Sequence, residues 1–220
     1  MTSIAPLDPA TATGRQREQR DAHVPSILMV LTVLTGARSW TLADGTQHPT
    51  GFWAEEFTVQ HRVFTDAGAE VTIATLGGVS AIADELSLAL AMNGNDPSKV
   101  EELRNYLDRC RGALASPLAL SHVTPDEFDA VFTPGGNGPM QDLSVDTDTA
   151  RIYEALLPDS SKVVASVCHG PASFISAGDG DGEWLFKGRR LTSFLNEEEA
   201  QVGFAAKTPW LLETIQEEQS

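Results

Sequence analysis

Cys168 stands at a point in the sequence where a cysteine becomes chemically unusual. The run 162–167 predicts a short buried strand, and residues 169–174 predict the start of a helix. A side chain at such a corner points away from the sheet and faces the free N–H groups of the helix. Both effects favour a thiolate, so we expect a lowered pKa and a nucleophile at Cys168. The spacing of Ser166, Cys168 and Gly170 is that of a nucleophile elbow with cysteine in place of serine.

The second cysteine, Cys110, has a different setting. It lies on the apolar stripe of a helix predicted over 97–114, with Asp96 as N-cap and Pro97 as the first residue. A cysteine on such a stripe packs like a small hydrophobe, so we expect a structural role. Two cysteines in 220 residues make no disulfide framework, which favours a reduced, cytoplasmic setting.

Glu56 is a carboxylate on a face that otherwise reads as apolar. In a helix predicted over 51–67, Phe52, Glu56, Val59 and Val63 share one face by their spacing. A carboxyl group held against apolar side chains has a raised pKa and can exchange protons near neutrality. A rotated helix that leaves Glu56 half-solvated fits the spacing equally well.

A glycine pair, Gly135 and Gly136, follows a strand predicted over 129–133. Backbone N–H groups there, together with that of His169, can form an oxyanion hole. An ordinary glycine turn is the plainer interpretation. His169 directly follows the nucleophile, and geometry decides whether its ring reaches the thiol or makes only a structural hydrogen bond.

Glu199 has a structural explanation of its own. Asn196 and Glu199 have the spacing of a capping box at a helix start. On spacing alone the capping role is favoured over a role in chemistry.

The elements that must position these residues alternate along the chain. Apolar runs predict strands over 26–34, 70–76, 129–133 and 163–167, with a further one over 190–194, and helices over 51–67, 97–114 and 148–157. The clearest strands are apolar on both faces, which is typical of a parallel sheet covered by helices on both sides. The fold class is therefore α/β. Such sheets bind ligands at the carboxyl ends of their strands, where Cys168 and the glycine pair fall.

Composition limits the function classes. Residues 1–24 are polar and predict a disordered tail, followed by one domain over 25–220 with a helical insertion at about 79–126. The net charge of −16 argues against nucleic-acid and anionic-membrane partners, and no apolar run could span a bilayer. The five histidines lack metal-ligand spacing, and no Walker or G-x-G-x-x-G loop is present, so we expect no metal and no cofactor.

Four segments together resemble the ThiJ/PfpI superfamily, whose fold is a class I glutamine amidotransferase-like, flavodoxin-like sandwich. They are 51–56 (GFWAEE), 132–140 (FTPGGNGPM), 163–172 (VVASVCHGPA) and 191–199 (LTSFLNEEE), and the match runs over about 26–212.

The resemblance assigns roles to individual residues. It implies that Cys168 is the nucleophile beside His169, and that Glu56 is the acidic residue of the family. It also places the acid of a catalytic triad at Glu199, which puts that role level with the capping role. It implies that the glycine pair binds substrate or oxyanion, joined by Trp53 and by Asn137, where the close branch usually has histidine.

The Cys-His pair and the Gly-Phe-Trp motif resemble the heat-shock-chaperone-like branch. That branch implies glutathione-independent glyoxalase activity (glyoxalase III, or D-lactate dehydratase), a lyase reaction that detoxifies methylglyoxal through a hemithioacetal on Cys168. A stress-response chaperone or a cysteine oxidation sensor without turnover is the alternative. A PfpI-type peptidase, a deglycase or an amidotransferase-like hydrolase fits less well.

Relatives usually continue beyond the segment that matches 209–214 with another strand and helix. Here the sequence ends at Ser220. We therefore expect a sheet edge or an apolar face that the chain itself leaves uncovered. The chain would then be a natural short form, a fragment, or a subunit that covers this surface by forming a homodimer.

Overall fold

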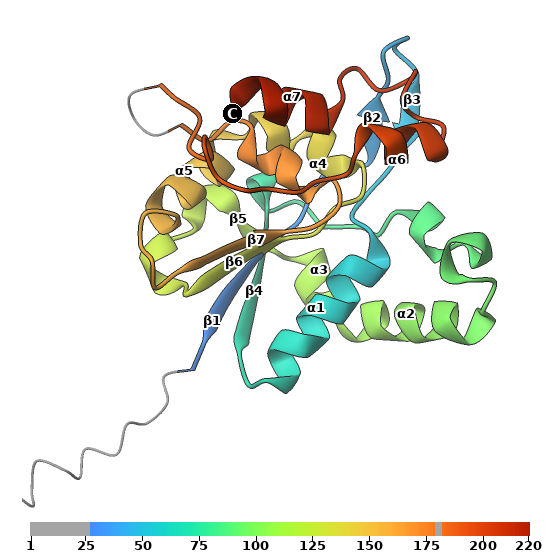
Figure 1. Ribbon diagram of the computed structural model, residues 1–220. Coiled ribbons are helices and arrows are strands. Elements are labelled where there is room, and N and C mark those ends of the chain that lie inside the picture. The colour runs from blue at the N-terminus through green and yellow to red at the C-terminus, as the bar shows by residue number, and fades with distance from the viewer. Residues whose placement is uncertain (1–26, 179–181) are drawn as a thin grey trace, which may run out of the picture.

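A five-stranded parallel sheet lies at the centre of the computed structural model, which describes residues 27–178 and 182–220 (Figure 1). The tail predicted over 1–24 lies outside the described residues. The strands lie in the order β5 (Leu118–Ala119), β4 (Glu70–Thr75), β1 (Met29–Val33), β6 (Ala130–Thr133) and β7 (Val163–Ser166). The chain passes from β1 to β4 and β5 on one side and then to β6 and β7 on the other, and ligands bind at the strand ends where the strand order reverses in this way. The predicted α/β class is confirmed.

Helices cover both faces of this sheet, which explains why its strands read as continuous apolar runs. On one face, Leu31 and Val33 of β1 pack in a core cluster with residues of α5 (Thr147–Leu156). On the other face, Phe57 of α1 (Ala54–Asp66) lies in a cluster with Ile73 of β4.

The fifth strand is not the one predicted. Residues 190–194 form no strand, and most of this stretch is exposed. The fifth strand is β5, whose two residues pair with Ala74 and Thr75 of β4. A pairing this short leaves no period-2 pattern in the sequence.

The predicted insertion at 79–126 holds mainly helical turns. Asp96 caps α2 (Pro97–Arg109) as expected, with its side chain accepting from the N–H of Ser98. The helix predicted to run on to 114 instead breaks at Cys110, and α3 (Arg111–Ala115) follows. Cys110 packs against a core cluster, as predicted for a structural cysteine.

The remaining elements gather on the side of the sheet where the strands end (Figure 1). They are the antiparallel hairpin β2 (Ser39–Thr41) and β3 (Gln47–Pro49), and the helices α4 (Gly138–Gln141), α6 (Asn196–Gln201) and α7 (Leu212–Gln219). An apolar cluster that includes Trp40, Met140 and Leu212 joins β2, α4 and α7.

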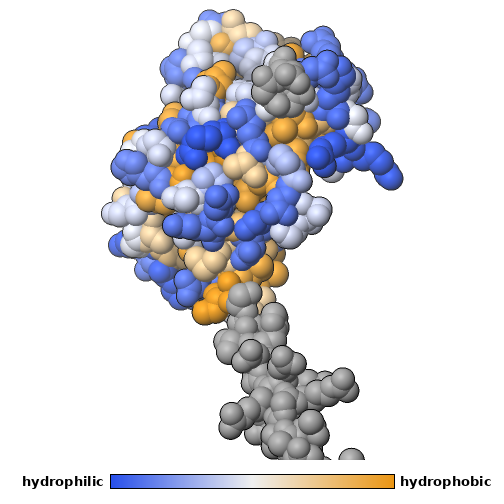
Figure 2. Space-filling model, turned by 90° about the vertical axis from the view of Figure 1, so that its left-hand side faces the viewer, coloured by the Kyte–Doolittle hydropathy of each residue, from blue (hydrophilic) through white to orange (hydrophobic). Residues whose placement is uncertain are grey.

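One edge of the sheet is β7, where Val163 is exposed, as is Val167 directly after the strand. Figure 2, which faces the side that carries α5, shows apolar residues at the surface between hydrophilic ones. Among the described residues, none of the helices combines the length and the apolar character that crossing a membrane requires.

Candidate active site

Cys168 occupies a strained corner immediately beyond β7. Its φ of 57° lies in the left-handed region, which residues other than glycine rarely adopt. The corner is tight, because a Cβ on Gly170 would lie 2.2 Å from the carbonyl oxygen of Thr133 and 2.3 Å from Oγ of Ser166. The structure therefore explains the small-x-Cys-x-Gly spacing, and Cys168 has the backbone of a nucleophile elbow.

The glycine pair brings the loop after β6 against this corner. A Cβ on Gly135 would lie 2.7 Å from Cβ of Cys168 and 2.7 Å from the backbone nitrogen of His169. The backbone N–H groups of Gly136 and His169 face the sulfur and act to lower the pKa of the thiol. Gly135 differs from the expectation, because its N–H donates to Glu56 Oε2 at 2.7 Å. Two N–H groups, not three, therefore face the reactive atom.

Glu56 reaches the sulfur from the first turn of α1. Its carboxyl group accepts a hydrogen bond from the Gly135 N–H and lies beside the Cys168 thiol, and burial raises the pKa of Glu56, as predicted. The predicted helix face is wrong, since Val63 is exposed and the buried side includes Phe57. Glu56 is held at the site by the start of α1 at the strand ends and not by an apolar stripe.

The pKa of the Cys168 thiol is raised, opposite to the expectation from the elbow. Burial is the largest cause and the charge of Glu56 the second, and together they outweigh the N–H groups of Gly136 and His169. The helix that follows is a 3₁₀ helix of five residues, Gly170–Phe174, too short to supply much dipole. Burial and the charge of Glu56 therefore both favour the thiol form of Cys168.

His169 links the sulfur to a buried carboxylate. Its Nδ1 lies 3.4 Å from Sγ of Cys168, and its Nε2 hydrogen-bonds Oε1 of Glu199. The His169 and Glu199 residues are only 4% and 1% exposed. When the ring is neutral, Nε2–H donates to Glu199 and Nδ1 is left to accept the thiol proton. The structure thus brings the three residues into a Cys-His-Glu relay.

The capping role expected for Glu199 belongs to its neighbour. The side chain of Glu198 accepts from the N–H of Leu195, which is the N-cap of α6. The backbone N–H of Asn196 donates to Glu213 instead. Glu199 is turned inward, and its Oε2 has no hydrogen-bond partner among the described residues. The capping prediction erred by one residue, which in a helix is about 100° of rotation.

These groups lie at one side of a cavity of about 560 Å³. The residues that line it are Trp53, Glu56, Leu86, Met92, Gly136, Asn137, Cys168, His169, Phe194, Gln201, Val202 and Phe204. Trp53 and Asn137, expected at the site, do lie there, and the backbone N–H of Trp53 also donates to the carbonyl of Gly135 at 3.0 Å.

Sequence reasoning missed the apolar lining. Phe194 is the clearest case, since its ring lies 4.3 Å from that of His169 and its N–H donates to the Cys168 carbonyl at 2.9 Å. The available signal was that Phe194 lies in the segment 191–199, which the sequence motif already links to the site through Glu199. Leu86 and Met92 lie in the helical insertion and Val202 just beyond α6, and nothing in their spacing pointed to a pocket.

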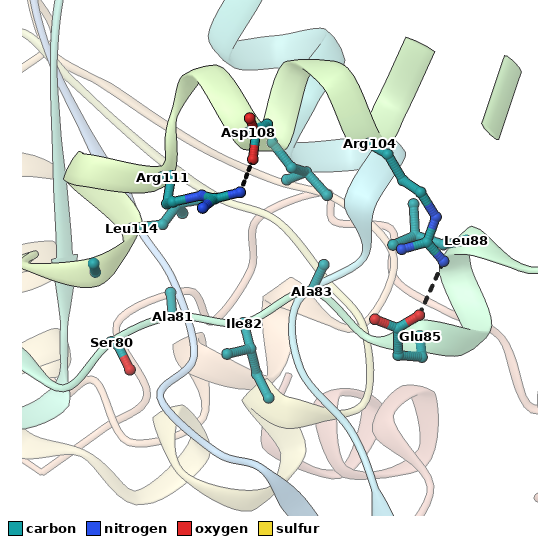
Figure 3. A pocket seen from close by; sticks show the side chains of 12 residues that line it. Ser80, Ala81, Ile82, Ala83, Glu85, Leu88, Arg104, Asp108, Arg111 and Leu114 are labelled. Carbon is teal, nitrogen blue, oxygen red and sulfur yellow. Dashed lines mark hydrogen bonds and ion pairs between the residues drawn. The ribbon is translucent and has the colours of Figure 1, made fainter. Parts of the chain in front are cut away.

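A second cavity of about 610 Å³ lies between α2, α3 and the extended segment 80–83 (Figure 3). Its charged side chains turn toward one another, with Arg104 paired to Glu85 at 3.1 Å and Arg111 paired to Asp108. None of the described residues that line it is a cysteine or histidine. Within the described part of the chain, no group of histidine, cysteine and acidic side chains could hold a metal ion.

Comparison with known proteins identifies relatives of this chain. The chain is 29% identical over 178 residues to glyoxalase 3 of Candida albicans, covering 80% of this chain and 73% of that protein. The crystal structure of glyoxalase III from the same organism superposes with a TM-score of 0.66 at 25% identity, covering 87% of this chain and 75% of that one.

A protein/nucleic acid deglycase of Staphylococcus aureus is 25% identical over 167 residues, which cover 73% of this chain and 54% of the deglycase. The chain thus spans about half the length of that relative. The model of the DJ-1/PfpI family matches residues 49–208, the stretch that contains Glu56, the glycine pair, Cys168 and Glu199. From this match over most of its length, the chain belongs to the DJ-1/PfpI family.

Proposed function

We propose that the protein is a glutathione-independent glyoxalase that converts methylglyoxal, or a related 2-oxoaldehyde, into a 2-hydroxy acid. The observation that carries the proposal is the setting of Cys168, whose sulfur meets Glu56, His169 and two backbone N–H groups beside one cavity. The similarity to glyoxalase 3 supports this activity over others of the family.

The first step forms a carbon–sulfur bond. His169 accepts the thiol proton at Nδ1, and the sulfur of Cys168 attacks the aldehyde carbon. The carbonyl oxygen takes up the negative charge and is stabilised by the N–H groups of Gly136 and His169. Glu199, hydrogen-bonded to Nε2, stabilises the positive charge that then forms on the imidazole.

The second step moves a proton between adjacent carbons. Glu56 removes the C–H proton of the hemithioacetal and returns a proton to the neighbouring carbonyl carbon. The imidazolium of His169 gives its proton to the oxygen on that neighbouring carbon. The former aldehyde carbon is thereby oxidised to a thioester while its neighbour is reduced to a hydroxyl-bearing carbon, so no external electrons are needed. Water then cleaves the thioester, which releases the hydroxy acid and restores the thiol. The raised pKa of Glu56 suits a group that must both accept and donate a proton.

The test is to mix the purified protein with methylglyoxal in the absence of added thiols and to measure lactate. We expect lactate in proportion to methylglyoxal consumed, and none above background from a Cys168→Ala variant. Cys110→Ala is the matched control and should retain activity, because Cys110 lies in a core cluster away from the cavity. Lactate formation that survives Cys168→Ala would refute the proposed nucleophile.

The similarity to the deglycase supports a second candidate, the removal of early adducts of 2-oxoaldehydes. The two activities are distinguished by offering a preformed adduct after free aldehyde has been removed. Release of product faster than spontaneous adduct breakdown would favour the deglycase. Suppression of client aggregation by the Cys168→Ala variant would instead favour a chaperone without turnover.

A further inference from the structure

The cavity beside Cys168 is far larger than methylglyoxal requires. Its volume of about 560 Å³ corresponds to roughly twenty water-sized groups, at about 30 Å³ for each. Methylglyoxal carries only a methyl group beyond its two carbonyls. A substrate matched to this cavity has a much bulkier group on the carbonyl next to the aldehyde.

The lining indicates the chemical nature of that group. The carboxyl, thiol and imidazole groups come together where Glu56, Cys168 and His169 meet. Most of the remaining lining is apolar and is supplied by Trp53, Leu86, Met92, Phe194, Val202 and Phe204. None of the described residues lining the cavity is an arginine or a lysine. A carboxylate or phosphate on the substrate would find no cationic partner and would lie near the charge of Glu56.

Exposed apolar side chains mark the mouth. Leu86 and Met92 come from the short helical turns Glu85–Leu88 and Leu90–Asn93, and Val202 lies just beyond α6. These side chains are 42%, 42% and 48% exposed although all three line the same cavity. Two segments far apart in sequence thus present apolar surface that a bound apolar group would cover.

We infer that the protein prefers 2-oxoaldehydes with an uncharged, bulky, apolar substituent, of the aryl class, over methylglyoxal. The inference rests on the proposed glyoxalase function and adds the substrate class. The reacting atoms and the proton transfer are the same for both substrates. The additional substituent lies against the apolar lining and leaves toward the mouth with the product hydroxy acid.

The experiment compares kcat/KM for phenylglyoxal, methylglyoxal and a phenylglyoxal with a carboxylate on its ring. We expect phenylglyoxal to exceed methylglyoxal by about tenfold or more, mainly through KM, and to exceed the carboxylated ring by at least as much. Equal values for phenylglyoxal and methylglyoxal, or a preference for the carboxylated ring, would overturn the inference.

A double variant at the mouth, Met92→Ser with Val202→Ser, should lower the ratio of phenylglyoxal to methylglyoxal kcat/KM by about tenfold. Val145→Ser is the matched control, since Val145 is exposed but does not line the cavity. It should leave the ratio unchanged. An unchanged ratio in the double variant would contradict a role for these side chains in selecting substrate.

A binding measurement separates this inference from the proposed function. Acetophenone, which lacks the aldehyde, should protect Cys168 from alkylation better than acetone does. If no aldehyde is turned over but acetophenone still protects, the glyoxalase proposal fails and the apolar binding site stands. If turnover occurs without such protection and without aryl preference, the glyoxalase proposal stands and the inference about the apolar substituent fails.

Discussion

Two of the cavities among the described residues have similar volumes but differ in what their side chains can do. The cavity beneath α2 and α3 has a larger volume, about 610 Å³, yet the arginines in it are neutralised at the surface by acidic neighbours. The smaller one, about 560 Å³, holds Glu56 and His169 against a cysteine with a left-handed backbone. Volume therefore does not distinguish the two cavities, whereas burial of ionisable groups beside a nucleophile does.

The difference follows from how each cavity is built. The cavity of Cys168 lies where the strands of the sheet end, so residues from α1 and from the ends of β6 and β7 meet there. The other lies between two helices and an extended segment of the insertion, where long charged side chains reach solvent (Figure 3). The comparison predicts that matched substitutions will have very different effects in the two places.

The largest difference is expected between Glu56→Gln and Glu85→Gln. Each change removes one negative charge and keeps the shape of the side chain. Glu56→Gln should lower kcat by about 10²–10⁴-fold, the usual contribution of a general acid or base. Glu85→Gln should leave kcat within about twofold, because the ion pair of Glu85 with Arg104 is exposed. Similar kcat values for the two variants would remove the distinction between the cavities.

The next pair is Glu199→Gln and Asp108→Asn, both of which remove a carboxylate that accepts from a nitrogen. A hydrogen bond to a charged group contributes about 1.5–3 kcal/mol, so Glu199→Gln should reduce kcat by roughly 10–100-fold. Asp108→Asn should not change it measurably. Thermal denaturation of both variants checks that the loss reflects the relay and not unfolding.

Alkylation of Cys168 tests the electrostatics of the site directly. Because burial and the charge of Glu56 raise the pKa of this thiol, its reaction with iodoacetamide should reach half its maximum above the ordinary pH of about 8.5. In Glu56→Gln the second cause disappears, the pKa falls, and the rate at a fixed pH rises by up to about tenfold for each unit of the fall. A faster-alkylating variant with slower turnover would show that Glu56 contributes to turnover in a way that does not depend on its effect on thiol ionisation.

That measurement is best made in a Cys110→Ala background, which removes the other thiol. A wild-type midpoint at or below 8.5, with no change in Glu56→Gln, would contradict the predicted coupling of the two groups.

The smallest effect is expected for Arg104→Gln. The Arg104–Glu85 pair is exposed, so its loss should change the free energy of unfolding by less than about 1 kcal/mol. Chemical denaturation measures this. A loss several times larger would mean that the second cavity has a structural role that its exposed ion pairs do not account for.

Local features of the sequence were sufficient to predict much of this fold. Four of the five strands of the sheet, the Asp96 cap and the elbow at Cys168 depend on residues within a few positions of one another. The short strand β5 could not be predicted in this way, because it exists only through its pairing with β4.

The chemistry of the site was less predictable than its location. The elbow suggested a lowered thiol pKa, but burial by distant segments and the approach of Glu56 reverse the direction. Glu199 could not be distinguished from a capping residue by spacing, since Glu198 and Glu199 differ only by the rotation of one residue in a helix. These outcomes depend on long-range packing, which no local pattern records.

Helix α6 connects two parts of the cavity of Cys168. It carries Glu199 on its inner side and is followed, three residues after Glu199, by Val202 at the mouth of the cavity. One short helix and its C-cap therefore supply both the carboxylate bonded to His169 and an apolar side chain at the entrance, so any change in the position of α6 would alter the catalytic end and the entrance of the cavity together.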